Sequence, residues 1–438
     1  MTRAAAIGDN RTAGFVEMKD VRTDAGFAKR LALRGLAAYC LLALAMLLAA
    51  RALSAAEFSH ATARPSIVIP VGPLGYGPPG ELYFMMRYSQ VSLDFVDADH
   101  LLFTFQKKEL LRHSPDEQPD DDDQLIHAVV LHLPEGKVSA SADWRMPDRR
   151  RYLWPLSPGS FLVRQRDTLF LTDASLKLQP YGRFPGRLVG LQVSPGGDLL
   201  VAQIEQPEKR EGVPVAQAQA GSAPDSTASK PLTTDARPIL MLVLRVKDHA
   251  LVAKSRVRSP VNLPINQSGF FESLEGKPNQ WVLSFTPLTD GSPAPSAKPF
   301  AQVTSTCQPT LTCVSRDTIV ATRCTPSYEH LATFLTLQGK MLWEHKWQAR
   351  RVWPTWAYSQ NGSRVAQGML VRPAGQTPLG MDDVSGQQVD VFDTASGALL
   401  LSAPATPIYD AGQNFALSAD GRRFAILHDG AIEIYDLP

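Results

Sequence analysis

The last stretch of the chain, residues 415–436, constrains the fold more than any other part of the sequence. Two turns, Ser418-Ala-Asp-Gly421 and Asp429-Gly430, divide it into three short runs. Asp-Gly suits a tight hairpin because both residues adopt a positive φ readily. The run Phe424–Leu427 is continuously apolar, as in a strand covered on both faces, whereas the third run alternates apolar residues with Glu433. The stretch therefore predicts three strands of a four-stranded antiparallel unit.

Turns of the first kind recur along the chain, which indicates a repeat architecture. Each follows one apolar run and opens another, as at Ser194–Asp198, Ser359–Arg364 and Ser418–Arg422, with degenerate copies at Val96–His100 and Ser157–Ser160. A second kind of loop alternates with the first, at Leu133–Lys137, Leu337–Lys340 and Asp393–Gly397. Stacked four-stranded units require this alternation.

The pattern Ser-x-Asp-Gly-x-x-Phe/Leu-Ala, a strand ending Ile-Tyr-Asp or Val-Phe-Asp, and then Thr-x-x-Gly resembles the WD40/YVTN-type β-propeller superfamily. Residues Leu337–Glu344 also resemble the blade motif of quinoprotein-type propellers. The Gly-His and Trp-Asp dipeptides of true WD40 repeats are absent, so the resemblance is to the superfamily and not to that subfamily. It covers about residues 66–438. It implies an all-β fold, a β-propeller of seven four-stranded blades, with six and eight blades as alternatives.

The units of this predicted propeller start near residues 90, 150, 187, 266, 306, 354 and 413. The last unit, counted from Phe415, stops after its third strand. The run Ser66–Val71 is the first β-rich segment of the domain, and we expect it to supply the missing outermost strand by pairing with residues 431–436. Pro70 fits that role because proline is tolerated on edge strands.

The N-terminal part predicts passage through a membrane. An apolar helix is expected over residues 35–56, because residues 35–50 are uninterrupted and apolar and follow Lys29, Arg30 and Arg34. Ser54-Ala-Ala56 resembles a signal-peptidase site, so a cleaved signal peptide and an uncleaved signal anchor both remain open. Residues 1–34 form a cytoplasmic, disordered lead, and residues 57–438 form the propeller domain. The predicted location is a bacterial-type envelope, periplasmic or anchored in the inner membrane with the propeller outside the cytoplasm.

Composition narrows the classes of partner. The chain has 44 basic and 43 acidic residues, and this balance gives no electrostatic reason to expect nucleic acid. Three long loops of low complexity, at about residues 112–124, 205–236 and 372–388, are expected to be mobile. The sequence contains no G-x-S-x-G, H-E-x-x-H, phosphate-binding glycine loop or C-x-x-C-H, so no catalytic, cofactor-binding or metal residue is assigned.

The cysteines beyond the apolar segment are Cys307, Cys313 and Cys324. In an exported protein they predict a disulfide. In an antiparallel hairpin that turns at Arg316-Asp317, the residue numbers of paired positions add up to about 633. Cys307 and Cys324 come closer to this sum than Cys313 and Cys324, which favours the pair Cys307–Cys324 and leaves Cys313 buried and free. A metal site with His330 as fourth ligand is the weaker alternative, because the spacing matches no common zinc pattern.

Two further clusters have both a functional and a structural interpretation. Asp120–Asp123, with Asp116 and Glu117 nearby, resembles a calcium loop in its carboxylates but lacks the turn glycine, which favours a solvated loop. Four tryptophans lie close together in the sequence and suggest a carbohydrate or cofactor platform, although packing between blades is favoured: Trp343, Trp347, Trp353 and Trp356.

These observations favour a non-catalytic exported propeller that binds a partner protein or ligand through one loop face. The alternative is a propeller enzyme, a hydrolase, lyase or quinone-dependent oxidoreductase with its site in the central funnel. A convergence of three or more carboxylates, histidines or arginines in that funnel would favour the enzyme.

Overall fold

The structure is a computed structural model with a first unit, residues 1–61, and a second unit, residues 62–438, of which the second is described below. It describes residues 64–78, 91–109, 111, 122–206, 239–288, 296–327, 329–347, 350–373, 384–409 and 413–438. The predicted cytoplasmic lead and the predicted apolar helix of residues 35–56 lie outside these ranges. Within them, no helix has the length and apolar character needed to cross a membrane.

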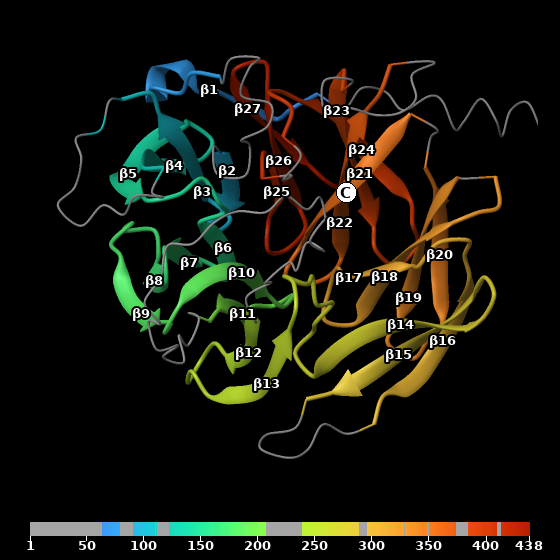
Figure 1. Ribbon diagram of the computed structural model, residues 1–438. Helices are drawn as coiled ribbons and strands as arrows, with labels where there is room; N and C mark the ends of the chain where they lie inside the picture. The colour runs from blue at the N-terminus through green and yellow to red at the C-terminus, as the bar shows by residue number, and fades with distance from the viewer. Residues whose placement is uncertain are drawn as a thin grey trace, which may run out of the picture. The chain divides into compact units, whose positions relative to one another are not determined.

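The second unit is a β-propeller of seven antiparallel sheets arranged around a centre (Figure 1). Six sheets have four strands and one has three. The all-β propeller and its seven blades, which the sequence resemblance implies, are therefore confirmed. We number the blades 1 to 7 in chain order from β2, so that β1 belongs to blade 7.

The strands of blades 1 to 3 are β2 Val91–Phe95, β3 His100–Lys107, β4 Gln124–His132, β5 Lys137–Met146; β6 Leu153–Ser157, β7 Ser160–Gln165, β8 Thr168–Thr172, β9 Gln179–Arg183; β10 Arg187–Val193, β11 Leu199–Glu205, β12 Ile239–Arg245 and β13 Leu251–Val257. The strands of blades 4 to 7 are β14 Gly269–Lys277, β15 Gln280–Pro287, β16 Lys298–Thr304; β17 Thr310–Cys313, β18 Thr318–Cys324, β19 His330–Thr336, β20 Met341–Lys346; β21 Arg351–Tyr358, β22 Arg364–Val371, β23 Gly386–Asp393, β24 Leu399–Ala405; β25 Phe415–Leu417, β26 Arg423–His428, β27 Ala431–Asp436 and β1 Ile67–Pro70.

The recurring Ser-x-x-Gly turns have one hydrogen-bond pattern. In blade 7 the amide of Arg423 donates to Ser418 Oγ over 2.9 Å, and the Gly421 amide donates to the Ser418 carbonyl over 2.9 Å. Ser359 and Ser194 accept the corresponding amides in blades 6 and 3. The glycine of each turn has a positive φ, which L side chains rarely adopt. The sequence pattern thus reports the backbone geometry of the first turn of a blade.

These first turns meet at one face of the propeller, which we call the turn face. An ion pair of 3.1 Å joins Arg316 of blade 5 to Asp198 of blade 3. The amide of Asn361 in blade 6 donates to the Ala419 carbonyl in blade 7 over 3.0 Å. The three long segments predicted to be mobile connect second to third strands, β3 to β4, β11 to β12 and β22 to β23, so they join the propeller at the opposite face; most of their residues lie outside the described ranges.

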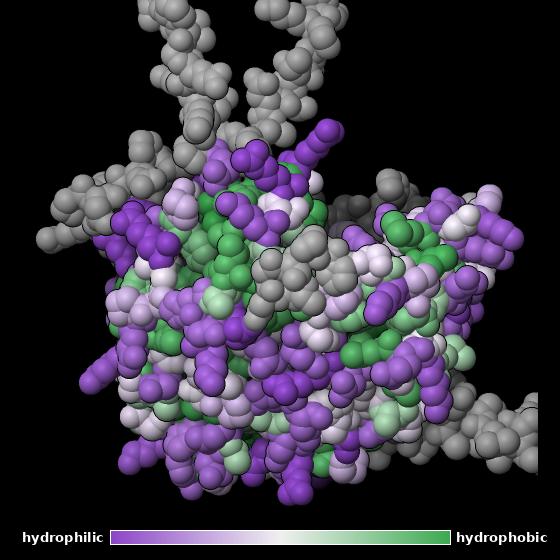
Figure 2. All heavy atoms as spheres, turned by 90° about the horizontal axis from the view of Figure 1, so that it is seen from below, coloured by the Kyte–Doolittle hydropathy of each residue, from purple (hydrophilic) through white to green (hydrophobic). Residues whose placement is uncertain are grey.

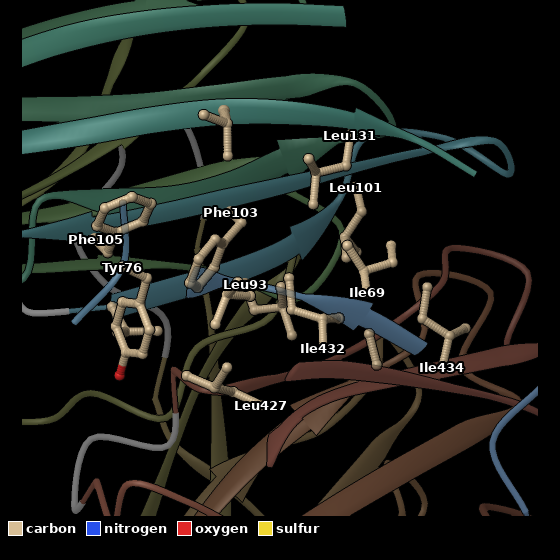
Figure 3. Close-up of a cluster of buried hydrophobic side chains, with 14 of the residues drawn as sticks. Ile69, Tyr76, Leu93, Leu101, Phe103, Phe105, Leu131, Leu427, Ile432 and Ile434 are labelled. Carbon is tan, nitrogen blue, oxygen red and sulfur yellow. The ribbon is translucent and has the colours of Figure 1, made fainter. Parts of the chain in front are cut away.

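The N-terminal strand closes the ring. β1 is the outermost strand of blade 7, and Ile67 and Ile69 lie opposite Ile434 and Ile432 on β27. This pairing confirms the expected closure, with Pro70 on the edge. Ile69 is 5% exposed and packs in a cluster that joins blade 7 to blade 1 (Figure 3). Closure therefore comes from backbone pairing and from apolar burial together.

Blade 4 departs from the expected four strands. Its sheet contains only β14, β15 and β16, and residues 261–266 take the innermost position with one bridge, Ile265 to Phe270. Side chains of blade 3 hold this segment: Gln203 bonds both the amide and the carbonyl of Val261, at 2.8 and 2.6 Å. Pro260 and Pro264 carry no amide hydrogen, which explains why the segment forms no regular ladder.

Candidate functional site

A cavity of about 1570 Å³ occupies the centre of the propeller. It is lined by the innermost strands β2, β6, β10, β17, β21 and β25 and by residues 262–265 of blade 4. Ser194, Gln360 and Ala419 extend the lining to the turn face. At the opposite end a lobe reaches under blade 5, where Thr322, Glu329 and Trp347 line it.

Three ionisable side chains from different strands share the wall of this cavity: Asp94 on β2, Arg151 just before β6, and Tyr358 at the end of β21. Ser92 Oγ donates to Asp94 Oδ2 over 2.8 Å. Arg151 Nε donates to the Leu153 carbonyl over 3.0 Å, and its guanidinium lies 5.3 Å from the centre of the Trp154 ring. Arg151 is exposed, Asp94 and Tyr358 are half-buried, and strands of the surrounding blades enclose the cavity that all three residues line.

This enclosure shifts the ionisation of all three groups. Burial raises the pKa of Asp94 to about 6, although the Ser92 hydrogen bond and the charge of Arg151 oppose the shift. Burial lowers the pKa of the Arg151 guanidinium, against the effect of Asp94. Burial also raises the pKa of Tyr358 to about 12. Asp94 therefore changes charge near neutral pH, as a general acid or base would.

None of these three residues stands out in the sequence as a candidate site residue. One signal was available: in Val91-Ser-Leu-Asp-Phe95 the polar residues Ser92 and Asp94 alternate with apolar ones, so both face one side of an inner strand. Arg151 and Tyr358 gave no local signal, because the ring brings them near Asp94 from distant blades. This group has one carboxylate and one arginine, but the cavity lining also includes Glu329, His330, Arg351 and Arg372. The wall as a whole therefore carries more than the three carboxylates, histidines or arginines expected of an enzyme.

The four tryptophans have different environments. Trp343 stacks on Phe334 at 3.6 Å and donates from Nε1 to the Thr394 carbonyl of blade 6. Trp356 contacts the same Phe334 edge-on at 5.8 Å, and Trp347 lies 5.2 Å from the His330 ring. Trp353 is 42% exposed. Packing between and within blades thus accounts for Trp343, Trp347 and Trp356, which share one core cluster, but not for Trp353.

The cysteines lie at the connection from blade 4 to blade 5. Cys307 and Cys324 form a disulfide with a Cα–Cα distance of 5.5 Å, and Cys313 is free and buried on β17. Burial raises the pKa of the Cys313 thiol. His330 Nδ1 lies 3.6 Å from Cys324 Sγ, but no group of three or more His, Cys, Asp or Glu side chains suited to a metal occurs in the described ranges.

The aspartate run is only partly described. Asp122 pairs with Arg149, and Asp123 pairs with Arg145 at the end of β5. Asp116, Glu117, Asp120 and Asp121 lie outside the described residues. The two described carboxylates therefore neutralise neighbouring arginines.

A scan against protein-family models and a search of curated proteins gave no match. Solved structures do resemble the chain. A chain of a mitotic checkpoint complex is 11% identical, with 86% of this chain and 92% of that chain covered and a TM-score of 0.43. The WD40 domain of Toxoplasma gondii coronin is 8% identical over 80% and 84%, with a TM-score of 0.39.

The acylaminoacyl peptidase of Pyrococcus horikoshii is 9% identical, with a TM-score of 0.45. The match covers 80% of this chain and 51% of the peptidase, so the chain spans about half of that protein's length. At such identities these likenesses concern the fold and carry no argument about activity.

Proposed function

We propose that the protein is an exported, non-catalytic propeller that binds a ligand in its central cavity, with access at the turn face. The observation that supports this most is the lining of the cavity. Serine, threonine, asparagine and glutamine side chains outnumber charged ones along it, and aromatic rings interrupt them. Ligand sites combine apolar and aromatic walls with a few placed polar groups. On the side seen in Figure 2, by contrast, most of the surface is hydrophilic and the apolar residues form separate patches.

The test is a comparison of the full-length protein with a variant whose cavity is filled. Thr312→Trp adds bulk on β17, where Thr312 lines the cavity. Native mass spectrometry of both proteins, isolated from the producing cells and again after incubation with cell extract, should find a small molecule retained by the wild type alone. Equal retention by both proteins would contradict a site in the cavity.

A propeller enzyme is the second candidate, and Asp94 is the observation that favours it. Its pKa of about 6 suits proton transfer, and Tyr358 lies in the same wall. Asp94→Asn preserves size and removes the acid. If the retained molecule is turned over by the wild type and only bound by the variant, the protein is an enzyme.

The proposal of export is based on the basic residues before the apolar run of residues 35–50, on that run itself, and on the cysteines of the propeller. Disulfides persist in oxidising compartments, and the Cys307–Cys324 pair fits such a location. A C-terminal fusion to a reporter that fluoresces only in the cytoplasm should stay dark, and Leu42→Arg with Leu47→Arg should restore fluorescence. Mass spectrometry of the unreduced exported protein should find Cys307 joined to Cys324, and three free thiols would contradict the proposed oxidation state.

A further inference from the structure

Trp353 lines the cavity in a backbone conformation that its own residue type disfavours. Its φ is 50°, and Pro354 follows, although proline confines the preceding residue to extended conformations. Bulky residues with positive φ are outliers that gather at functional sites. Of the exposed large hydrophobic side chains in the described ranges, Trp353 is the one tryptophan, at 42% exposed. Core packing therefore does not explain why a tryptophan occupies this position.

A bulge in β21 presents this side chain to the cavity. The register between β21 and β22 shifts between Val352 and Thr355. All eight residues of β21 line the cavity, as do all four residues of the regular strand β17, so backbone and side chains both form this wall. Bulges re-aim side chains next to functional sites. Trp353 is also not alone, because four of the seven tryptophans of the chain line this one cavity: Trp154, Trp347, Trp353 and Trp356.

The charges near Trp353 are paired within the protein. Glu329 and Lys346, which line the lobe, form an ion pair of 2.5 Å. Arg351, two residues before Trp353, pairs with Asp390 of β23. A charged ligand would have to compete with these pairs, whereas a neutral one would leave them intact.

Neutral hydrogen-bonding groups lie at the same end of the cavity. Thr310 and Thr322 face each other across β17 and β18 and both line it. Trp347 is 6% exposed, and its indole nitrogen has no hydrogen-bond acceptor among the residues that the structure describes. Because protein encloses this nitrogen, the two threonine hydroxyls are the neutral groups that a ligand in the cavity would reach.

We propose that the cavity around Trp353 binds a neutral carbohydrate, with a sugar ring stacked on the Trp353 indole. The face of an indole ring is negative, and the C–H groups on one face of a pyranose carry small positive partial charges. The sugar hydroxyls would bond the hydroxyls of the two threonines. This inference rests on the proposed function, since it names the ligand class of the same cavity.

The test uses the full-length protein and three neutral probes, maltohexaose, cellohexaose and chitohexaose, with tetramethylammonium as a cationic probe. Saturation-transfer NMR and calorimetry should detect at least one hexasaccharide. Trp353→Ala should weaken its binding at least tenfold, while the matched control Met341→Ala, at a site 58% exposed on β20 and outside the cavity lining, should leave it unchanged. Trp353→Gly, which suits the positive φ, should keep or raise the melting temperature and still lose binding.

Three results would overturn the inference: no hexasaccharide binds, tetramethylammonium binds in their place, or a hexasaccharide binds Trp353→Ala as well as the wild type. The cavity-filling Thr312→Trp variant separates this from the proposed function. If Thr312→Trp loses a ligand that Trp353→Ala retains, the cavity remains a binding site and only the role of Trp353 is refuted.

Discussion

Blades 7 and 4 hold their innermost position by different means. In blade 7, β25 forms a regular ladder with β26, and the Ser418 turn fixes the register. In blade 4, residues 261–266 keep one bridge to their own sheet and are held by Gln203 and Gln192 of blade 3. The innermost strand of a propeller can thus be replaced by a segment that a neighbouring blade stabilises.

The two blades also differ in how strongly the sequence specifies them. Blade 7 has both turn motifs and alternating strands, and its missing outer strand is supplied by β1. Blade 4 has neither motif at its inner turn, and its inner segment presents Asn262 and Leu263 to the cavity. Local sequence therefore determines the strands β25, β26 and β27 of blade 7, whereas the inner segment of blade 4 depends on contacts with blade 3.

Removing β1 should have the largest effect. Deletion of residues 58–72 removes the outer strand of blade 7 together with Ile69 and Val71, which are 5% and 1% exposed. Burial of these two side chains alone is worth roughly 3–6 kcal/mol. Thermal unfolding should show a large drop in melting temperature, whereas Val68→Ala on the exposed face of β1 should change it little. A drop no larger than that of Val68→Ala would mean that β1 does not close the ring.

Alanine substitutions at two glycines should distinguish the close contact between blades 4 and 5 from the open hairpin of blade 7. Gly339 and Gly430 have φ of +80° and +74°, so alanine is strained at both, by roughly 1–2 kcal/mol. A Cβ at Gly339 would also lie 1.8 Å from the Phe300 carbonyl oxygen of blade 4, whereas a Cβ at Gly430 meets nothing within 4 Å. Urea unfolding should find Gly339→Ala clearly less stable than Gly430→Ala, and equal losses would contradict the close contact between blades.

Gln203→Ala tests whether side chains hold the inner segment of blade 4. The change removes both hydrogen bonds to Val261 and should destabilise the protein by about 2 kcal/mol, at about 1 kcal/mol for each bond. Amide hydrogen exchange should increase in residues 261–266 more than in β25. If exchange rises equally in both places, the segment is held by the whole ring and not by blade 3.

Asp94→Asn should have the smallest effect, and the size of that effect should depend on pH. Because the folded pKa of Asp94 is about 6, above the ordinary value of 3.8, the folded protein binds more protons between these values. The contribution of Asp94 to the stability of the wild type therefore falls as pH rises through that window. Relative to the wild type, the free energy of unfolding of the variant should be higher by on the order of 1–2 kcal/mol at pH above about 7 and almost unchanged near pH 4.

The matched control for this prediction is Glu272→Gln, an exposed carboxylate on β14 of blade 4. Melting temperatures of the three proteins over the pH range give the comparison. A stability difference for Asp94→Asn that stays constant with pH would show that Asp94 ionises normally in the folded protein.

Much of the fold could be predicted because the turn sequences mark where the strands of a blade begin and end. The residues of each Ser-x-x-Gly turn form its hydrogen bonds among themselves, so the turn can be recognised from the local sequence. The units that were expected to begin near residues 187 and 413 accordingly begin close to β10 and β25. The pairing of residues 66–71 with the last blade follows from counting the strands of that blade. The inner segment of blade 4 could not be predicted as such. Its partners, Gln192 and Gln203, lie some 60 to 70 residues earlier and form no pattern with it.

The cavity was less predictable than the ring. The cluster of four tryptophans indicated a part of the chain that does line the cavity. Which of the four is exposed could not be predicted, because the irregular register of β21 beside Trp353 has no signal in the sequence. The environment of Asp94 depends on Arg151 and on the enclosing strands, which come from different blades. Burial and charge are properties of the closed ring, so they appear only when all seven blades are in place.

The closing strand also sets the order of events during synthesis. Ser66 bonds Ile434, and 368 residues separate them. At about 5–20 residues per second, roughly 20–70 s pass between the emergence of β1 from the ribosome and that of its partner. Throughout this interval Ile67 and Ile69 have no strand to pair with. The outer position of blade 7 is therefore filled only after the last blade has been made, although its strand is among the first to be synthesised.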